Sequence, residues 1–314
     1  MKILFVSMFC LAYISVIAQD GIRAKHFSKH LNFLASDKLE GRYPGTRGNE
    51  IAYEYVQDCF KRFGLKKFNG SYLQSFDAVR RSDSLRIPTY NVVGFIEGQD
   101  ENLKGEYIVI GAHYDHLGWG GKHTGSKNKD TNAIHNGADD NASGTAMLLE
   151  LAQELARNRK QLKRSIVFVA FGAEEFGLQG SKFFVNNLPV AKESIQVMIN
   201  MDMVGRLNSE NHLYMGGAGT FPGGVEFMKA MGEGSGLNLI VHAGGVGGSD
   251  HVSFYRQNIS AIGMHTGGHD QYHLPTDDAS LINSDGAEKV GKYIYNVLLG
   301  LSRREEKFGF VKQD

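Results

Sequence analysis

From about Tyr90 onward, short apolar runs alternate with segments whose apolar residues recur at helical spacing. The runs lack the alternation of polar and apolar residues that marks a strand with one face in water, and they cover residues 107–110, 166–171, 197–199 and 261–264. Continuously apolar strands are typical of sheets covered on both faces, and strands that alternate with helices form βαβ units. The pattern therefore predicts an α/β fold in which crossover helices cover the sheet.

Three segments between and after these runs are predicted to be helices, at 142–156, 225–231 and 286–301. A fourth, over 51–63, has the same spacing and is followed by Gly64, a typical helix stop. Cys59 lies within this helix and is expected to be a buried core thiol. By contrast, 119–135 is polar and glycine-rich without periodicity, which predicts a surface loop near the site.

The N-terminal residues have the sequence pattern of an export signal. Lys2 precedes an apolar run over 3–18, with Val16 and Ala18 at the positions of a small-residue cleavage site. We therefore expect a signal peptide at 1–18, a single catalytic domain at 19–314, and a periplasmic or extracellular protein without stable membrane insertion after cleavage. The run is short for an uncleaved anchor. With Cys10 removed, Cys59 has no partner for an internal disulfide.

The charge balance excludes one class of partner. Lysines and arginines number 34, as do aspartates and glutamates, so the chain lacks the basic excess that drives nucleic-acid binding. We expect no nucleic-acid partner.

Histidines and carboxylates directly follow the predicted strands. In open α/β sheets, ligands bind beyond the carboxyl ends of the strands, so these residues are expected to converge. They are His113 and Asp115 in GAHYDH, Glu174 and Glu175 in GAEEFGLQGS, Asp202 in NMDMVGR, and His265, His269 and His273 in HTGGHDQYHLPTDD, with Asp139 and Asp140 in NGADDNASG at the head of a helix. Carboxylates gathered in this way repel one another unless a cation neutralises them. Mixed imidazole and carboxylate ligands without thiolates suit zinc, with manganese or cobalt as substitutes.

Taken in this order, GAHYDHLG, NGADDNASG, AEEFGLQGS, NMDMVGR and YHLPTDD resemble the di-zinc aminopeptidases of the bacterial leucyl aminopeptidase type. The resemblance extends upstream to LASDKLEGRYPGTRGNE and TYNVVGFIEG. It implies a three-layer α/β/α sandwich with a mixed, mostly parallel central sheet. It also implies two zinc ions, one held by His113 and Asp202, the other by Glu175 and His273, with Asp140 bridging them and a cis peptide after Asp140.

The resemblance assigns roles to two further acids. Glu174 would take a proton from the attacking water and deliver it to the leaving amine, and Asp115 would accept the second ring N–H of His113 and fix its tautomer. Asp139 is expected to orient its loop. Asp250, His251, Arg206 and Tyr272 are weaker candidates at the rim or for substrate contact. For His116, His123, His135 and His242 the default is an ordinary surface or capping histidine.

The implied activity is hydrolysis of the N-terminal peptide bond of peptides. Three alternatives share the fold: a single-zinc glutaminyl-peptide cyclase, a carboxypeptidase-type dipeptidase that recognises a free carboxylate through arginines, and a receptor-like relative without enzymatic activity. The five ligand residues count against the last of these, because such relatives usually lack them.

Overall fold

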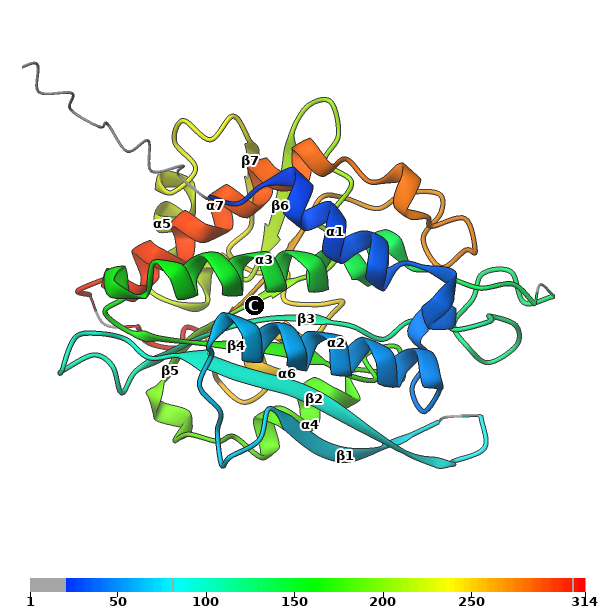
Figure 1. Ribbon diagram of the computed structural model, residues 1–314. Helices are drawn as coiled ribbons and strands as arrows, with labels where there is room; N and C mark the ends of the chain where they lie inside the picture. The colour runs from blue at the N-terminus through cyan, green and yellow to red at the C-terminus, as the bar shows by residue number, and fades with distance from the viewer. Residues whose placement is uncertain (1–20, 81, 131, 307, 314) are drawn as a thin grey trace, which may run out of the picture.

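A central sheet of eight strands runs through the described part of the chain, which in this computed structural model is 21–80, 82–130, 132–306 and 308–313 (Figure 1). The predicted signal peptide lies outside the described residues. The strand order is β1-β2-β4-β3-β5-β8-β6-β7. Four of the seven pairings are parallel and three are antiparallel, so the prediction of a mixed, mostly parallel sheet is confirmed. The strands are β1 (Leu73–Val79), β2 (Arg86–Ile96), β3 (Tyr107–His113), β4 (Ser165–Phe171), β5 (Ile195–Met201), β6 (His212–Gly216), β7 (Asn238–Val241) and β8 (Ala261–His265).

Two layers of helices cover the sheet. On one face lie α1 (Ala24–Leu34), α2 (Arg47–Phe63), α3 (Gly144–Arg157) and α7 (Ser284–Arg303), which pack on one another and on the central strands (Figure 1). On the other lie α4 (Gln179–Asn186) and α6 (His251–Tyr255), while α5 (Gly224–Ala230) packs against β7. No described helix is long and apolar enough to span a bilayer.

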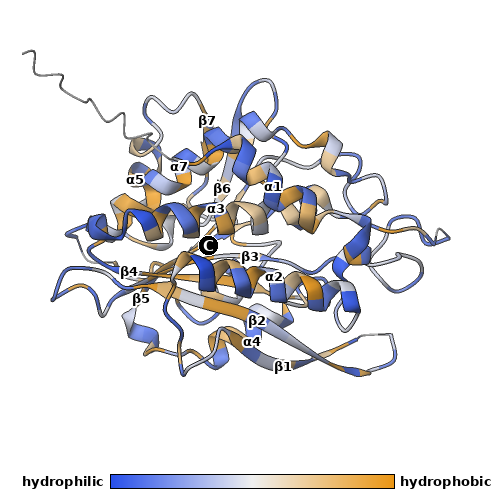
Figure 2. Cartoon of the chain, viewed as in Figure 1, coloured by the Kyte–Doolittle hydropathy of each residue, from blue (hydrophilic) through white to orange (hydrophobic). Residues whose placement is uncertain are grey.

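The four predicted strands are present as β3, β4, β5 and β8, each beginning within two residues of the expected start. β4 is buried at every position, because helices cover both of its faces. The larger apolar core lies under α1, α2, α3 and α7, and a second core forms around Phe184 of α4 and Phe254 of α6. The helices carry hydrophobic and hydrophilic faces, as Figure 2 shows for α2.

Helix α2 follows its sequence signals closely. The Thr46 side chain accepts a hydrogen bond from the Asn49 N–H at the helix start, and Gly64 ends the helix with φ 72°, a conformation that glycine adopts without strain. Cys59 is buried on its inner face, as predicted, and burial raises the pKa of its thiol.

Candidate metal centre

The carboxyl ends of four adjacent strands bring the predicted ligands together. Strands β4, β3, β5 and β8 lie side by side and parallel, so their last residues share one edge of the sheet. His113 ends β3, Glu175 follows β4 and Asp202 follows β5. Asp140 enters from a short kinked segment, Ala138–Ser143, that leads into α3 and in which Asp140 and Asn141 have non-helical backbone angles. All five predicted ligands and Glu174 line one cavity of about 540 Å³.

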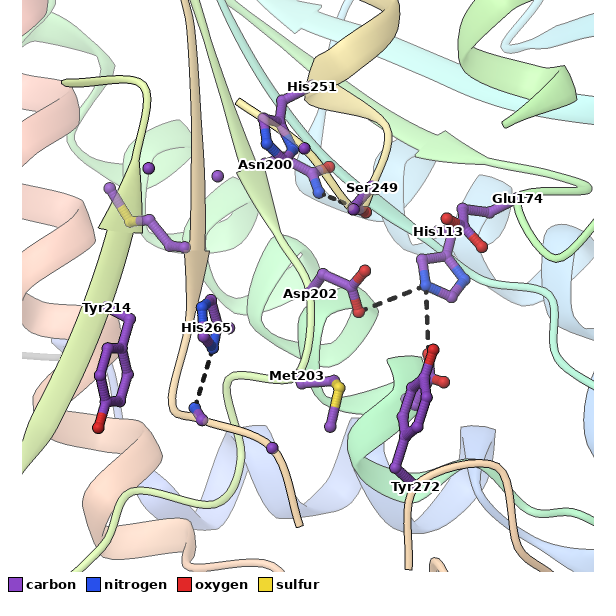
Figure 3. A pocket seen from close by; sticks show the side chains of 18 of the residues that line it. His113, Glu174, Asn200, Asp202, Met203, Tyr214, Ser249, His251, His265 and Tyr272 are labelled. Atoms are coloured by element: carbon purple, nitrogen blue, oxygen red, sulfur yellow. Dashed lines mark hydrogen bonds and ion pairs between the residues drawn. The ribbon is translucent and has the colours of Figure 1, made fainter. Parts of the chain in front are cut away.

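The first group of ligand atoms surrounds the ring of His113. Its Nε2 lies 3.3 Å from Oδ1 of Asp140 and 3.5 Å from Oδ1 of Asp202, and the three ligand atoms are close enough to share one ion. Figure 3 draws the contact between His113 and Asp202 as a dashed line. Among the described residues, Oδ1 of Asp202 is buried without a hydrogen-bond partner, and a bound cation would satisfy it.

The second group uses the other oxygen of Asp140. Oδ2 of Asp140 lies 3.1 Å from Nε2 of His273, and this nitrogen lies 3.4 Å from Oε2 of Glu175. Asp140 thus presents one oxygen to each group, which is the arrangement that a carboxylate bridging two ions requires. The peptide bond between Asp140 and Asn141 is cis, as the resemblance implied.

The charges of the cluster favour bound cations. Burial raises the pKa of Asp140, but hydrogen bonds from His113 and His273 outweigh this effect and bring the pKa well below its usual range. Although burial lowers it, the contacts with Asp140 and Glu175 raise the pKa of His273 to about 10. The imidazole protons therefore supply the positive charge that the carboxylates need, and a divalent cation would replace them. Nitrogen and oxygen donors without a thiolate fit zinc.

Glu174 lies beside the metal ligands but belongs to neither of the two ligand groups. It is partly buried, and this burial, followed by the charges of neighbouring carboxylates such as Glu175 and Asp250, raises its pKa well above the usual range. A carboxyl with a raised pKa beside a metal centre is suited to accept and return a proton.

The predicted role of Asp115 needs a correction. The ring Nδ1 of His113 faces the backbone carbonyl oxygen of Asp115 at 3.2 Å, whereas its distance to the nearer carboxylate oxygen is 3.8 Å. The two carboxylate oxygens instead accept the backbone N–H groups of Glu174, at 2.9 Å, and Glu175, at 3.2 Å. Asp115 therefore fixes the peptides that carry these two acids, and the backbone fixes the ring of His113.

Two histidines that we expected on the surface are buried. His116 has no exposed surface, and its Nδ1 lies 2.9 Å from Oε1 of Glu175. His135 is also fully buried and contacts Ser126 Oγ at 2.8 Å and the carbonyl oxygen of Ala133 at 2.9 Å. The default expectation was an ordinary surface or capping histidine, and its surface part was wrong for both residues, because the sequence of a loop does not show what packs over it.

Residues around the ligands hold the loop of Asp140 in place. Asp139 accepts a hydrogen bond from Gly205 N–H at 2.7 Å and lies 3.3 Å from His269, so it orients the loop as predicted. Asp277, which sequence reasoning missed, accepts the N–H groups of both Asp139 and Asp140 through one oxygen. Its position in YHLPTDD, four residues after His273, was the available signal.

Arg42 was also missed. This fully buried side chain donates hydrogen bonds to four carbonyl oxygens, those of Leu34, Tyr114, Asn136 and Gly137, at 2.6 to 3.0 Å. It therefore links an N-terminal segment to the two loops that carry Asp115 and Asp140.

The weaker candidates separate into two sets. His251 and Tyr272 line the cavity, and the Tyr272 ring stacks on His273 with centroids 3.9 Å apart. Arg206 is not among the lining residues, and it lies 3.5 Å from Asp277 instead. Asp250 is fully buried behind the cavity, where burial raises its pKa to about 7. The loop over 119–135 reaches the site at Lys127, which lines the cavity.

The model of peptidase family M28 matches residues 91–298 of this chain. The chain belongs to this family. Its relatives include leupeptin-inactivating enzyme 1 of Streptomyces exfoliatus, 29% identical over 243 residues that cover 77% of this chain and 48% of the relative. Aminopeptidase YwaD of Bacillus subtilis is 27% identical over 285 residues, which cover 86% of this chain and 56% of the relative. The chain thus spans about half the length of these curated relatives.

Solved structures confirm the fold. The glutaminyl cyclase of Bacteroides thetaiotaomicron matches with a TM-score of 0.72 at 20% identity, and the match covers 89% of this chain and 98% of that one. At this identity the likeness establishes the α/β/α architecture and no more. The prediction of a three-layer sandwich with a mixed sheet is therefore confirmed.

Proposed function

We propose that this M28 protein is a zinc-dependent aminopeptidase that binds two zinc ions and hydrolyses the N-terminal peptide bond of peptides. The observation that carries the proposal is the position of Asp140, whose Oδ1 lies near Nε2 of His113 and whose Oδ2 lies near Nε2 of His273. The first ion would be held by His113, Asp140 and Asp202, the second by Asp140, Glu175 and His273. The sequence match to aminopeptidase YwaD supports the same activity.

When bound, the two zinc ions supply a Lewis acid for the scissile carbonyl and a water of lowered pKa. Glu174 would take a proton from that water and then return it to the nitrogen of the leaving group. Its position suits it to this transfer, because it lines the same cavity as the five ligands. Asp115 keeps the Glu174 peptide in position through the hydrogen bond to its N–H.

The cavity suits the amino end of a peptide better than the carboxyl end. A free carboxylate is usually recognised by arginine, and none is present among the described residues that line the cavity. The lining lysine, Lys127, has its ammonium over the ring of Tyr272, 4.7 Å from the centroid. A positively charged α-amine is compatible with the carboxylates of Glu174 and Asp202. These features favour an aminopeptidase over a carboxypeptidase-type dipeptidase.

The glutaminyl cyclase alternative is kept because of the solved structure with the same fold. Two complete ligand groups favour the two-ion hydrolase, since the cyclase reading needs one zinc. The hydrolase and the cyclase both need metal ligands, and this chain retains them. A receptor-like relative without activity usually lacks such ligands, so their presence argues against that alternative.

One experiment separates these readings. Purified protein would be analysed for metal content and assayed with aminoacyl anilides, with an N-terminal glutamine peptide for cyclisation, and with dipeptides that expose a C-terminal carboxylate. We expect two zinc ions per chain and release of N-terminal residues. Activity confined to cyclisation of glutamine, or a single zinc at saturation, refutes the proposal.

We also propose that the protein is exported, on the strength of the apolar run over 3–18 and the small residues at 16 and 18. Cell fractionation together with N-terminal sequencing of the mature chain tests this. A chain that retains Met1 in the cytoplasmic fraction contradicts it.

A further inference from the structure

His116 lies against the second ligand group but outside the cavity. It follows β3 by three residues, is fully buried, and is not among the residues that line the cavity. Its ring packs closely on the backbone, since a Cβ atom built on Gly137 would lie 2.4 Å from Cδ2 of the imidazole. His116 is therefore held in one place and does not contact a substrate in the cavity.

The two oxygens of Glu175 have different neighbours. Oε2 lies 3.4 Å from Nε2 of His273, on the side of the predicted ion. Oε1 lies 2.9 Å from Nδ1 of His116, at hydrogen-bond distance. Nδ1 of His116 is also 3.9 Å from Oδ2 of Asp140, and the ligand atoms of His116, Asp140 and Glu175 all lie within 4.8 Å of one another. On distance alone, His116 could therefore be a ligand of the second ion or a hydrogen-bond donor to Glu175.

The second ring nitrogen decides between these two roles. A histidine that binds a metal almost always donates its other ring N–H to an acceptor. His113 and His273 follow this rule, because their Nδ1 atoms lie 3.2 Å from the carbonyl oxygen of Asp115 and 3.0 Å from that of Gly125. Nε2 of His116, in contrast, is buried without a hydrogen-bond partner among the described residues.

If Nδ1 bound an ion, this Nε2 would carry an unpaired buried proton, which costs the full desolvation of a donor. If Nδ1 carries the proton instead, the unpaired atom is an acceptor, and the N–H is satisfied by Glu175.

We propose that His116 is a positioning residue of the second zinc site. Its Nδ1–H donates to Oε1 of Glu175 and turns Oε2 toward the ion, without binding the ion itself. This inference rests on the two-zinc centre proposed above. Loss of a hydrogen bond to a ligand typically weakens metal affinity by about 10 to 100-fold.

The test compares zinc affinities of His116→Leu and His116→Asn with the wild-type chain, using metal-free protein titrated with zinc against a competing chelator. The amide nitrogen of asparagine takes nearly the place of Nδ1 and donates a hydrogen bond, but it is a poor zinc ligand. We expect His116→Leu to lower the affinity for the second zinc ion by about 10 to 100-fold and to leave binding of the first ion unchanged. We expect His116→Asn to retain most of the wild-type affinity for the second ion. His123→Asn, at an exposed loop position, is the matched control and should bind as the wild type does.

Two outcomes overturn the proposal. One is a His116→Asn variant as weak as His116→Leu, which would make His116 a direct ligand. The other is a His116→Leu variant with unchanged affinity. X-ray absorption spectroscopy of the wild-type protein with two zincs gives a second measurement that needs no variant to fold. An average of one imidazole per zinc supports the proposal, whereas three imidazoles for two ions overturn it. A wild-type chain that saturates at one ion refutes the two-zinc centre itself, which is a distinguishable result.

Discussion

Oδ2 of Asp277 accepts a hydrogen bond from the backbone N–H of Asp140 at 3.1 Å and a second one from that of Asp139 at 2.9 Å. The bridging carboxylate is thus held through its own main chain by an acid that follows it by 137 residues. Because Asp277 is fully buried, these bonds form between a charged acceptor and donors that water does not reach.

Asp277→Ala leaves two buried N–H groups unpaired and removes the carboxylate that lies 3.5 Å from Arg206. Unsatisfied buried donors cost about 1 to 3 kcal/mol each, so we expect the loss of two to lower the free energy of unfolding by about 2 to 6 kcal/mol. The affinity for zinc should fall as well, because the loop that carries Asp140 is no longer held in place. Urea unfolding and metal analysis measure both effects. Asp278→Ala, one residue away and only partly buried, is the control; an equal loss in this variant would show that the effect is not specific to Asp277.

Glu174→Gln should retain both zinc ions and lose most of its turnover. The amide has nearly the shape of the carboxyl but cannot take a proton, and general acid–base groups typically contribute about 10² to 10⁴-fold to rate. Steady-state kinetics with an aminoacyl anilide and metal analysis of the same preparation check this. Activity within a few-fold of the wild type would remove Glu174 from the proton-transfer role.

Arg42→Lys should destabilise the protein despite its retained charge. A lysine ammonium has three donors on a flexible stem and cannot reproduce the planar fork that meets four carbonyl oxygens. We expect a loss of about 2 to 4 kcal/mol in the free energy of unfolding, since at least one buried carbonyl is left unpaired beside a displaced cation. Arg256→Lys, at an exposed position, should have no measurable effect in the same unfolding experiment. A stable Arg42→Lys variant would contradict the assigned role.

His30 should make the protein sensitive to acid. Burial, with smaller effects of Lys29 and Arg62, lowers the pKa of His30 from 6.5 to about 4, and Nδ1 of its ring lies 2.8 Å from the Tyr55 hydroxyl. The folded chain therefore takes up this proton at lower pH than the unfolded chain. Its contribution to stability is complete above pH 6.5 and is lost as the pH falls from 6.5 toward 4, by about 2 kcal/mol at pH 5.

The variant His30→Gln lacks the titrating group. Between pH 8 and pH 5 its unfolding free energy should fall by about 2 kcal/mol less than that of the wild type, as measured by urea unfolding at each pH. His123→Gln, at an exposed position, should keep the wild-type dependence. Identical pH dependence in wild type and His30→Gln would refute the prediction.

The sequence predicted the centre of the sheet better than its edges. The runs at β4 and β5 are apolar because helices cover both faces, and this burial leaves a plain pattern. β6 and β7 lie at one edge, are four to five residues long and are only partly buried. Their apolar runs, over 213–215 and 239–241, are short and were not recognised as strands. The same reason applies to β1, whose residues alternate between buried and partly exposed at the other edge.

The ligand residues were predictable because they directly follow strands, where the fold itself brings residues together. The residues that hold the ligands in place were not predictable. Arg42, His116 and Asp277 act through contacts with residues that are 8 to 138 positions away, and such contacts exist only once the chain has folded. The bond partner of His113 was mistaken for the same reason, because a two-residue spacing does not say whether the side chain or the carbonyl of Asp115 faces the ring.

Arg42 also has a practical consequence for anyone who trims the protein. The segment that the M28 model matches begins at residue 91, within β2 and well after Arg42. A fragment cut at that boundary would split a strand of the sheet and leave the carbonyl groups of Tyr114, Asn136 and Gly137 without their shared donor. The domain that folds is therefore longer than the segment matched by the family model. Expression fragments should begin before α1.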